Sequence, residues 1–189
     1  MSKKCSIRKA LAGGICLFVI CSCAKSPSLS LAERPKSWAE PVEMEGVPNL
    51  HRVSKELYRS AQPSKIGMRE LEKNGIKTVV SLRFFSDDED ELEGTMLNSG
   101  QVPMLTWDAD SEDDEAFLEL LEKSPKPVLV HCLHGADRTG AICAVYRVKK
   151  QGWSPQEASS EMVSGGFGFH FIWGNLPKWV AKETSDERL

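Results

Sequence analysis

The stretch of residues 128–140 constrains the fold of this chain more than any other. It opens with the apolar β-formers Val128-Leu129-Val130 directly after Pro127, a pattern typical of a short buried strand. Small and apolar residues at 141–148 follow it and predict a helix that packs against a sheet. This pattern favours an α/β fold, with a central mixed, mostly parallel sheet of four to five strands flanked by helices.

The loop between this strand and helix begins with Cys132 and ends with Arg138. Backbone N–H groups converge where such a loop enters a helix, and the helix dipole adds positive potential, so the loop can bind an anion. The planar guanidinium of Arg138 matches two phosphoryl oxygens. The same field favours the thiolate form of Cys132, which is the nucleophilic form. The loop therefore combines a nucleophile with a phosphate-binding site.

The motif His-Cys-x5-Arg-Thr-Gly at residues 131–140 resembles the signature of the cysteine-dependent protein-tyrosine and dual-specificity phosphatase superfamily. Residues 58–63 are also similar to a segment of bacterial dual-specificity-like phosphatases. No Gly-Lys-Ser/Thr follows the loop, so it is not a Walker motif and implies no nucleotide. The alternative is a buried cysteine that lies near an arginine by chance. The histidine, the loop glycine and the Thr-Gly pair argue against it.

The resemblance implies hydrolysis of phosphate monoesters through a phosphocysteine intermediate, with no metal and no organic cofactor. In this reaction Cys132 attacks phosphorus, and His131 orders the loop by hydrogen bonding. Thr139 offers its hydroxyl to the sulfur, which is the leaving group of the second step. The phosphoryl oxygens are bound by the residues that follow the nucleophile, which are Leu133, His134, Gly135, Ala136, Asp137 and Arg138.

The general acid that protonates the leaving group is expected on a neighbouring loop. The order strand, acidic loop, helix, strand, cysteine loop is also that of the phosphatase family, which takes its acid from the first of these loops. Asp108, after an expected strand at 101–107, is the first candidate, and Asp110 is the second. Asp137 is the third, because its place in the cysteine loop resembles that of myotubularin-type lipid phosphatases. Its alternative role is to orient the loop or a neighbouring side chain.

The substrate stays open among a protein carrying phosphotyrosine, phosphoserine or phosphothreonine, and a small phosphate ester. Family members that favour phosphoinositides often place lysines in the loop, whereas this loop has none and carries Asp137. His134 offsets that charge only when it is protonated. Few residues are available for a deep tyrosine pocket, which favours a shallow dual-specificity site. The alternatives are a phosphoinositide or inositol phosphate phosphatase, and a catalytically weak module that only binds phosphate.

The N-terminus has the features of a secretory signal at residues 1–22. Four basic residues precede an apolar run at 11–20, which is short for a membrane-spanning helix and is followed by small residues and cysteines. Residues 20–23 resemble a bacterial lipobox, although Cys21 stands where a small residue such as Ala or Ser is usual. We expect lipidation at Cys23 and an exported protein of the cell envelope, either a membrane-anchored lipoprotein or periplasmic. An uncleaved anchor and an ordinary signal peptide are the alternatives.

Charge and cysteine content exclude several other classes of protein. The chain has 24 Lys and Arg and 27 Asp and Glu, and residues 1–22 hold four of the basic residues and none of the acidic ones. The remainder therefore carries a net charge of −7, which argues against nucleic acid as a partner. Outside the leader and Cys23, the cysteines are Cys132 and Cys143, too few for a disulfide framework. Cys143 lies within the apolar helix and is expected in the core. The oligomeric state is not indicated.

Proline and serine recur through residues 23–47, where we expect a flexible tether, and residues 48–189 suit a single phosphatase domain. The acidic run 87–93 is expected to be a solvated helix face rather than a metal site, because no His or Cys accompanies it. The remaining predicted elements are strands at 50–54, 57–60 and 77–82, and helices at 64–74, 112–123 (capped by Ser111), 154–164 and 176–183.

Overall fold

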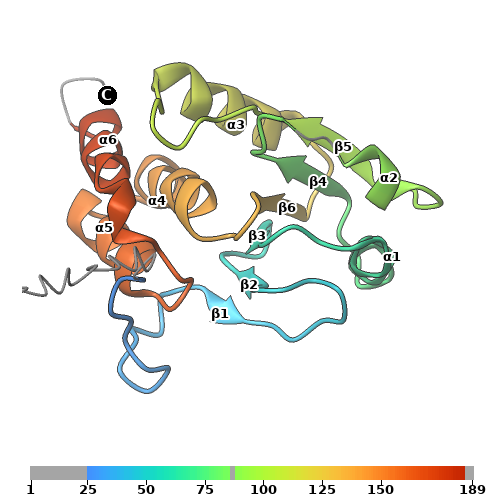
Figure 1. The fold of residues 1–189 in the computed structure, drawn as a ribbon, viewed down its shortest axis with the longest axis horizontal. Coiled ribbons are helices and arrows are strands. Elements are labelled where there is room, and N and C mark those ends of the chain that lie inside the picture. Colours follow the sequence, from blue (N-terminus) through green and yellow to red (C-terminus); the bar gives the residue numbers. More distant parts are fainter. Residues whose placement is uncertain (1–24, 86–87, 186–189) are drawn as a thin grey trace, which may run out of the picture.

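The computed structural model describes residues 25–85 and 88–185. The predicted signal peptide at 1–22 and the lipidation candidate Cys23 lie outside the described residues. Within the described part, none of the helices combines the length and the apolar character needed to cross a bilayer. The elements form one sheet with helices on both of its faces (Figure 1).

A mixed sheet of six strands forms the centre of the molecule, in the order β1-β2-β3-β6-β4-β5. The parallel strands are β3 (Leu57–Ser60), β6 (Val128–His131), β4 (Thr78–Ser81) and β5 (Asn98–Gln101). Two short antiparallel strands extend the sheet beyond β3, namely β1 (Glu40–Pro41) and β2 (His51–Arg52). The α/β class and the mostly parallel sheet are confirmed, with six strands in place of the four to five expected.

Helices cover the two faces of the sheet unequally. On one face lie α1 (Lys65–Lys73) and the short α2 (Glu89–Leu92). On the other face lie α3 (Ser111–Lys123), α4 (Asp137–Gln151), α5 (Pro155–Ser164) and α6 (Asn175–Glu183), with a 3-10 turn, η1 (Phe171–Trp173), before α6 (Figure 1). Successive strand residues face opposite sides. Val80 and Val130 therefore join the larger core under α4, while Val79 and Leu129 join the smaller core under α1.

The prediction of a strand at 101–107 is wrong in position. The strand is β5, which ends at Gln101, and it lies at the edge of the sheet with mostly exposed polar side chains. Such a strand lacks the apolar alternation by which strands are recognised in a sequence. Val102 and Met104, which suggested a strand, are buried, and their N–H groups still bond to carbonyls at the end of β4. The chain then leaves the sheet and forms the loop that carries Asp108.

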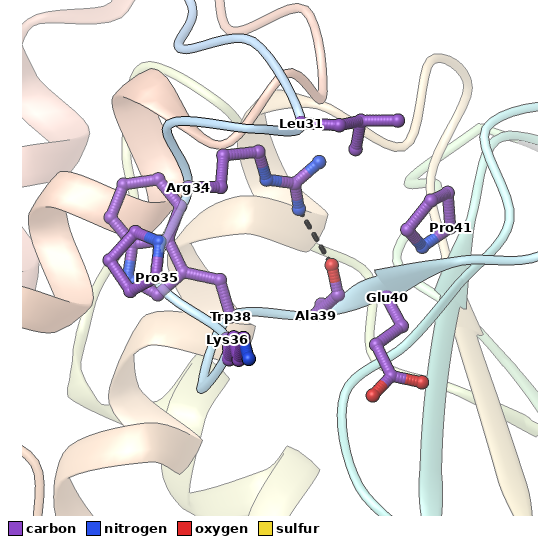
Figure 2. A pocket seen from close by; sticks show the side chains of 8 residues that line it. All are labelled: Leu31, Arg34, Pro35, Lys36, Trp38, Ala39, Glu40 and Pro41. Atoms are coloured by element: carbon purple, nitrogen blue, oxygen red, sulfur yellow. Dashed lines mark hydrogen bonds between the residues drawn. The ribbon is translucent and has the colours of Figure 1, made fainter.

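Within residues 25–47, where a flexible tether is expected from the sequence, several residues contact the domain. Trp38 and Ala39 are buried, and the N–H of Ala39 donates to the carboxylate of Glu161 in α5 at 2.6 Å. Arg34 donates to the carbonyl of Ala39, also at 2.6 Å, so the segment is closed on itself (Figure 2). The prolines and serines of this segment interrupt regular structure, and Leu29 and Leu31 are exposed, but Trp38, Ala39 and Val47 are buried.

Candidate active site

The cysteine loop lies at the carboxyl end of β6, in the middle of the sheet. Strands β3 and β4 flank β6 and run parallel to it, so the ends of all three strands meet at one edge, where α/β proteins bind ligands. The backbone turns at Gly135, whose φ is +66°. A Cβ atom at Gly135 would lie 2.4 Å from backbone atoms of Ser60 and Ala61. Only glycine fits here, so the loop can pack directly on the end of β3.

The carbonyl groups of the phosphate-binding loop (residues 133–138) are held from outside the loop. Three of them accept outside donors: Leu133 from the N–H of Gln62 (3.3 Å), His134 from Nδ2 of Asn49 (3.0 Å), and Gly135 from Nη2 of Arg59 (2.7 Å). A planar trans peptide directs its C=O and its N–H to opposite sides. The N–H groups that follow these carbonyls therefore turn toward the inside of the loop, as an anion site requires.

Cys132 and Thr139 lie at the two ends of this anion site. The side chain of Cys132 is buried, and α4 begins at Asp137 without a side-chain cap. An uncapped N-terminus leaves backbone donors for an anion. The hydroxyl of Thr139, in the first turn of α4, is buried and has no hydrogen-bond partner among the described residues. It is therefore available to a charged group inside the loop.

Arg138 is fixed by carbonyl groups from two neighbouring segments. Its Nη1 donates to the carbonyl of Leu82 at 3.1 Å and to that of Met104 at 3.3 Å. Leu82 directly follows β4, and Met104 lies in the segment between β5 and α3. These contacts place the guanidinium at the same edge of the sheet as Cys132 and connect it to the loop that carries Asp108.

His131 is completely buried and contacts an aspartate that the sequence reasoning missed. Its Nε2 lies 2.7 Å from Oδ2 of Asp88, and its Nδ1 lies 3.3 Å from the carbonyl of Cys132. Asp88 also accepts from Gln62 at 2.8 Å. Burial raises the pKa of Asp88, but the hydrogen bonds from His131 and Gln62 and the charge of Arg83 outweigh burial and hold this pKa below its ordinary value. The carboxylate therefore orients His131 and the end of β6.

The expectation that residues 87–93 form a solvated helix face does not hold for Asp88, which is buried. Local sequence gave no signal for this, because an acidic run looks alike whether or not one member faces the protein. Asn49 was also missed. It holds both the carbonyl of His134 and that of Phe167, and it is the non-glycine residue with positive φ (+56°) in the described part. Strained backbone of this kind often lies at functional sites.

Asp108 and Asp110 lie in the loop before α3. Asp108 is exposed, and its loop is held on one side by the contact of Arg138 with Met104 and on the other by Asn175, which donates to the carbonyl of Thr106 at 2.8 Å. Asp110, and not the expected Ser111, caps α3. Its carboxylate accepts from the first-turn N–H groups at 2.9 and 3.3 Å in a capping box with Asp113. The geometry thus leaves Asp108 the freer of the two carboxylates.

Asp137, the third candidate acid, is buried and faces His170. Its Oδ1 accepts a hydrogen bond from the backbone N–H of His170 at 2.9 Å. Its Oδ2 lies 2.9 Å from Nδ1 of the same histidine. The ring of His134 lies 5.5 Å from that of His170, and the donor atoms of His134, Asp137 and His170 lie within 4.8 Å of one another. Both Asp137 oxygens are already used, which fits its role in orienting a neighbouring side chain. A cavity of about 580 Å³ beside the loop is lined by His134, His170 and Lys25.

Comparison with known proteins relates this site to phosphatases. A family model described as "Polymorphic toxin system, DSP-PTPase phosphatase" matches residues 53–152, which include Cys132 and Arg138. The dual specificity protein phosphatase TpbA of Pseudomonas aeruginosa is 40% identical in an alignment of 146 residues that covers 72% of this chain. The match spans 62% of the length of TpbA.

Solved structures show the same relation. The crystal structure of P. aeruginosa TpbA matches with a TM-score of 0.72 and 34% identity, covering 79% of this chain and 92% of that chain. A Cys-to-Ser variant of TpbA has been solved in complex with pTyr. The core catalytic domain of the PP-IP phosphatase SIW14 from S. cerevisiae has the same fold, with a TM-score of 0.64 and 24% identity over 77% of this chain and 91% of that chain. From its motif, its fold and these relatives, the chain belongs to the DSP-PTPase family of cysteine-dependent phosphatases.

Proposed function

We propose that this protein hydrolyses phosphate monoesters through a phosphocysteine intermediate. The observation that carries the proposal is the loop itself. Cys132 and Arg138 lie at its two ends, and the carbonyls between them are held outward by Gln62, Asn49 and Arg59. A loop with inward N–H groups, an arginine and an uncapped helix N-terminus stabilises the three equatorial oxygens of a transferring phosphoryl group.

The residues divide the work of two chemical steps. The thiolate of Cys132 attacks phosphorus, the bond to the leaving oxygen breaks, and the carboxylic acid of Asp108 protonates that oxygen. Water then attacks the phosphocysteine, and the Asp108 carboxylate takes a proton from it. The sulfur leaves as thiolate, to which the unpartnered hydroxyl of Thr139 can donate.

We propose a phosphorylated protein as the substrate class, with phosphotyrosine as the first choice. The support is that the Cys-to-Ser variant of TpbA, a relative from the same family, has been solved in complex with pTyr. The loop also lacks lysine, which disfavours ligands with several phosphates such as inositol phosphates. The alternative to a phosphorylated protein is a small phosphate ester.

The test is hydrolysis of a generic aryl phosphate by the full chain, in the presence of a metal chelator, beside Cys132→Ser and Arg138→Ala. We expect turnover that either substitution abolishes. A catalytically weak binding module would instead bind phosphate without turnover, and metal-dependent turnover that survives Cys132→Ser would reject the mechanism. The values of kcat/KM for phosphotyrosine peptides, phosphoserine peptides and inositol phosphates then show which substrate class the protein prefers.

We also propose export to the cell envelope with a lipid on Cys23. The support is the sequence of the leader and its lipobox-like end. Only Ala24 separates Cys23 from Lys25, which forms a β-bridge with His170 beside the loop. Two residues span at most about 7 Å, so a lipid on Cys23 would hold the active-site side of the protein close to the membrane. Palmitate labelling that is lost in Cys23→Ala is the expected result, and labelling that persists contradicts it.

A further inference from the structure

Arg59 lies behind the phosphate-binding loop and takes no part in the chemical steps proposed above. It belongs to β3, which pairs with β6, and its side chain is 1% exposed. Its Nη2 donates to the carbonyl of Gly135 at 2.7 Å and lies 3.5 Å from that of Ala136. By holding the Gly135 carbonyl outward, Arg59 turns the next N–H of the loop inward, because the two groups of one peptide point in opposite directions.

The charge of Arg59 has no carboxylate partner among the described residues. The buried Arg147 offers a contrast, because it binds the carboxylate of Glu161 through Nε at 2.8 Å and Nη2 at 2.7 Å. The Nε of Arg59 is buried and has no hydrogen-bond partner in the part of the chain that the structure describes. A buried charge without a counter-ion is costly, and proteins retain one where it serves another purpose.

The neighbours of Arg59 compensate its charge only in part. Its Cζ lies 3.7 Å from the ring centroid of Phe167, a favourable cation–π contact that brings no negative charge. Burial lowers the pKa of Arg59, and Cys143, Glu161 and Cys132 are the groups whose negative charge opposes that lowering. Of these, Glu161 is already paired with Arg147, and burial raises the pKa of Cys143 to about 11. Cys143 is therefore neutral at physiological pH, and the loop whose Gly135 carbonyl Arg59 binds is the one that begins at Cys132.

We propose that Arg59 is a positioning residue of the phosphatase reaction. From behind the loop it fixes the Gly135 carbonyl outward, and its unpaired charge stabilises the anions that form inside the loop, first the thiolate of Cys132 and then the bound phosphoryl group. This rests on the phosphocysteine chemistry proposed above. Two positive groups thus act on the same site, Arg138 from within the loop and Arg59 from beneath it.

Two substitutions separate the charge of Arg59 from its hydrogen bond. Arg59→Gln keeps a donor for the Gly135 carbonyl and removes the charge, whereas Arg59→Lys keeps the charge. The readout is the rate at which iodoacetamide alkylates Cys132 in the full chain as a function of pH, followed on the peptide that contains Cys132. Because only this peptide is followed, alkylation of the cysteines in the N-terminal leader does not contribute to the measured rate. The second readout is kcat/KM for an aryl phosphate.

For Arg59→Gln we expect the midpoint of alkylation to move up by about one pH unit, because a nearby positive charge that favours the thiolate is lost. We also expect kcat/KM to fall by about tenfold, because the lost positive charge no longer stabilises the anion of the transition state, and a change of one pKa unit corresponds to about a factor of ten. In Arg59→Lys, which keeps the charge, the midpoint should lie closer to the wild-type value than it does in Arg59→Gln. Arg34→Met is the matched control: Arg34 also stacks on Phe167, at 5.4 Å, but it donates to Ala39 and not to the loop, so both readouts should stay unchanged.

An unchanged midpoint in folded Arg59→Gln overturns the proposal, even if kcat/KM falls, because a purely structural role lowers the rate without moving the midpoint. Folding is checked by circular dichroism and cooperative unfolding. If Arg59→Gln does not fold, Arg59→Met decides by the same midpoint, since apolar residues of similar volume often replace buried charges well. Wild-type turnover that is abolished by Cys132→Ser establishes the proposed function separately, whatever the result at Arg59.

Discussion

Two aspartates that are two residues apart in the chain have different surroundings. Asp110 accepts hydrogen bonds from the first-turn N–H groups of α3, so its carboxylate is used in capping the helix. Asp108 is exposed and precedes the helix by a turn, on a loop that Arg138 contacts through Met104. A general acid needs a carboxyl that can approach the leaving oxygen, and at the scale of single residues Asp108 meets this requirement better.

The substitution Asp108→Asn is expected to lower kcat by about 100-fold for substrates with poor leaving groups, because the leaving oxygen is no longer protonated. Activated aryl phosphates, which need less protonation, should be affected much less. Asp110→Asn serves as the control, because asparagine also caps helices well and helix α3 should persist. Rates measured over a series of leaving groups check this. A loss in Asp110→Asn with a normal Asp108→Asn would reverse the assignment.

Sequence motifs at the residue scale located the groups that act on phosphate but not those that support them. Cys132 and Arg138 were predictable because the chemistry fixes their spacing within one loop. Asp88 and Asn49 come from segments 40 or more residues away in the sequence, and only the folded sheet brings them to the loop. No local pattern marks such residues, since their roles depend on contacts that are distant in sequence.

At the scale of elements, the N-terminus of α3 concentrates negative charge. Burial, with the charges of Asp110, Asp114 and Asp108, raises the pKa of Asp113 to about 6, although a hydrogen bond from the N–H of Asp110 opposes the rise. Acidic residues in a first turn normally favour a helix through its dipole. Here burial, together with the neighbouring negative charges, outweighs that benefit for Asp113, so its ionised form destabilises the folded state.

The raised pKa of Asp113 predicts a pH dependence of stability. The folded pKa of about 6 lies above the ordinary value of 3.8, so the wild type loses stability as pH rises through that window. Asp113→Asn cannot ionise and keeps an acceptor for the capping box. Its melting temperature should therefore exceed that of the wild type increasingly from pH 4 to pH 6 and by a constant amount above it. Thermal unfolding at several pH values measures this difference, and a difference that does not change with pH contradicts it.

Elements with clear local signals were predicted correctly, and those without such signals were not. Helix α1 is capped by Ser64 as expected, and α5 starts after Ser154 with Pro155 in its first turn. Both depend on capping residues that act within one turn. Strand β5 was misplaced because an edge strand with polar side chains has neither apolar alternation nor β-branched residues.

At the scale of the whole molecule, the N-terminal segment contacts the domain through Trp38 and Ala39. Trp38 is 6% exposed, and the neighbouring Ala39 is tied to Glu161, which in turn binds Arg147 of α4. Residues 25–47 thus connect through α5 to the helix that follows the phosphate-binding loop. The segment that precedes the expected domain start at residue 48 is therefore in contact with the domain.

Trp38→Ala is expected to lower the free energy of unfolding by about 3 kcal/mol, the lower end of the cost of truncating a buried aromatic side chain. Leu31→Ala, in the same segment but at a side chain that is 66% exposed, should change it by less than about 0.5 kcal/mol. Denaturant titration of both variants measures the two values. Equal and small effects of the two substitutions would mean that the segment is the flexible tether expected from the sequence.

The sequence by itself determined the α/β class, the strand, loop and helix around Cys132, and the family of phosphatases, because each depends on residues close together in the chain. Only the tertiary structure decided that Asp88 orients His131, that Asp110 caps α3, and that Trp38 and Ala39 of the proline-rich N-terminal segment are buried. It also placed the unpaired guanidinium of Arg59 beneath the loop. These features follow from which distant segments become neighbours in the fold, and burial and hydrogen bonding between distant segments leave no periodic pattern in a single sequence.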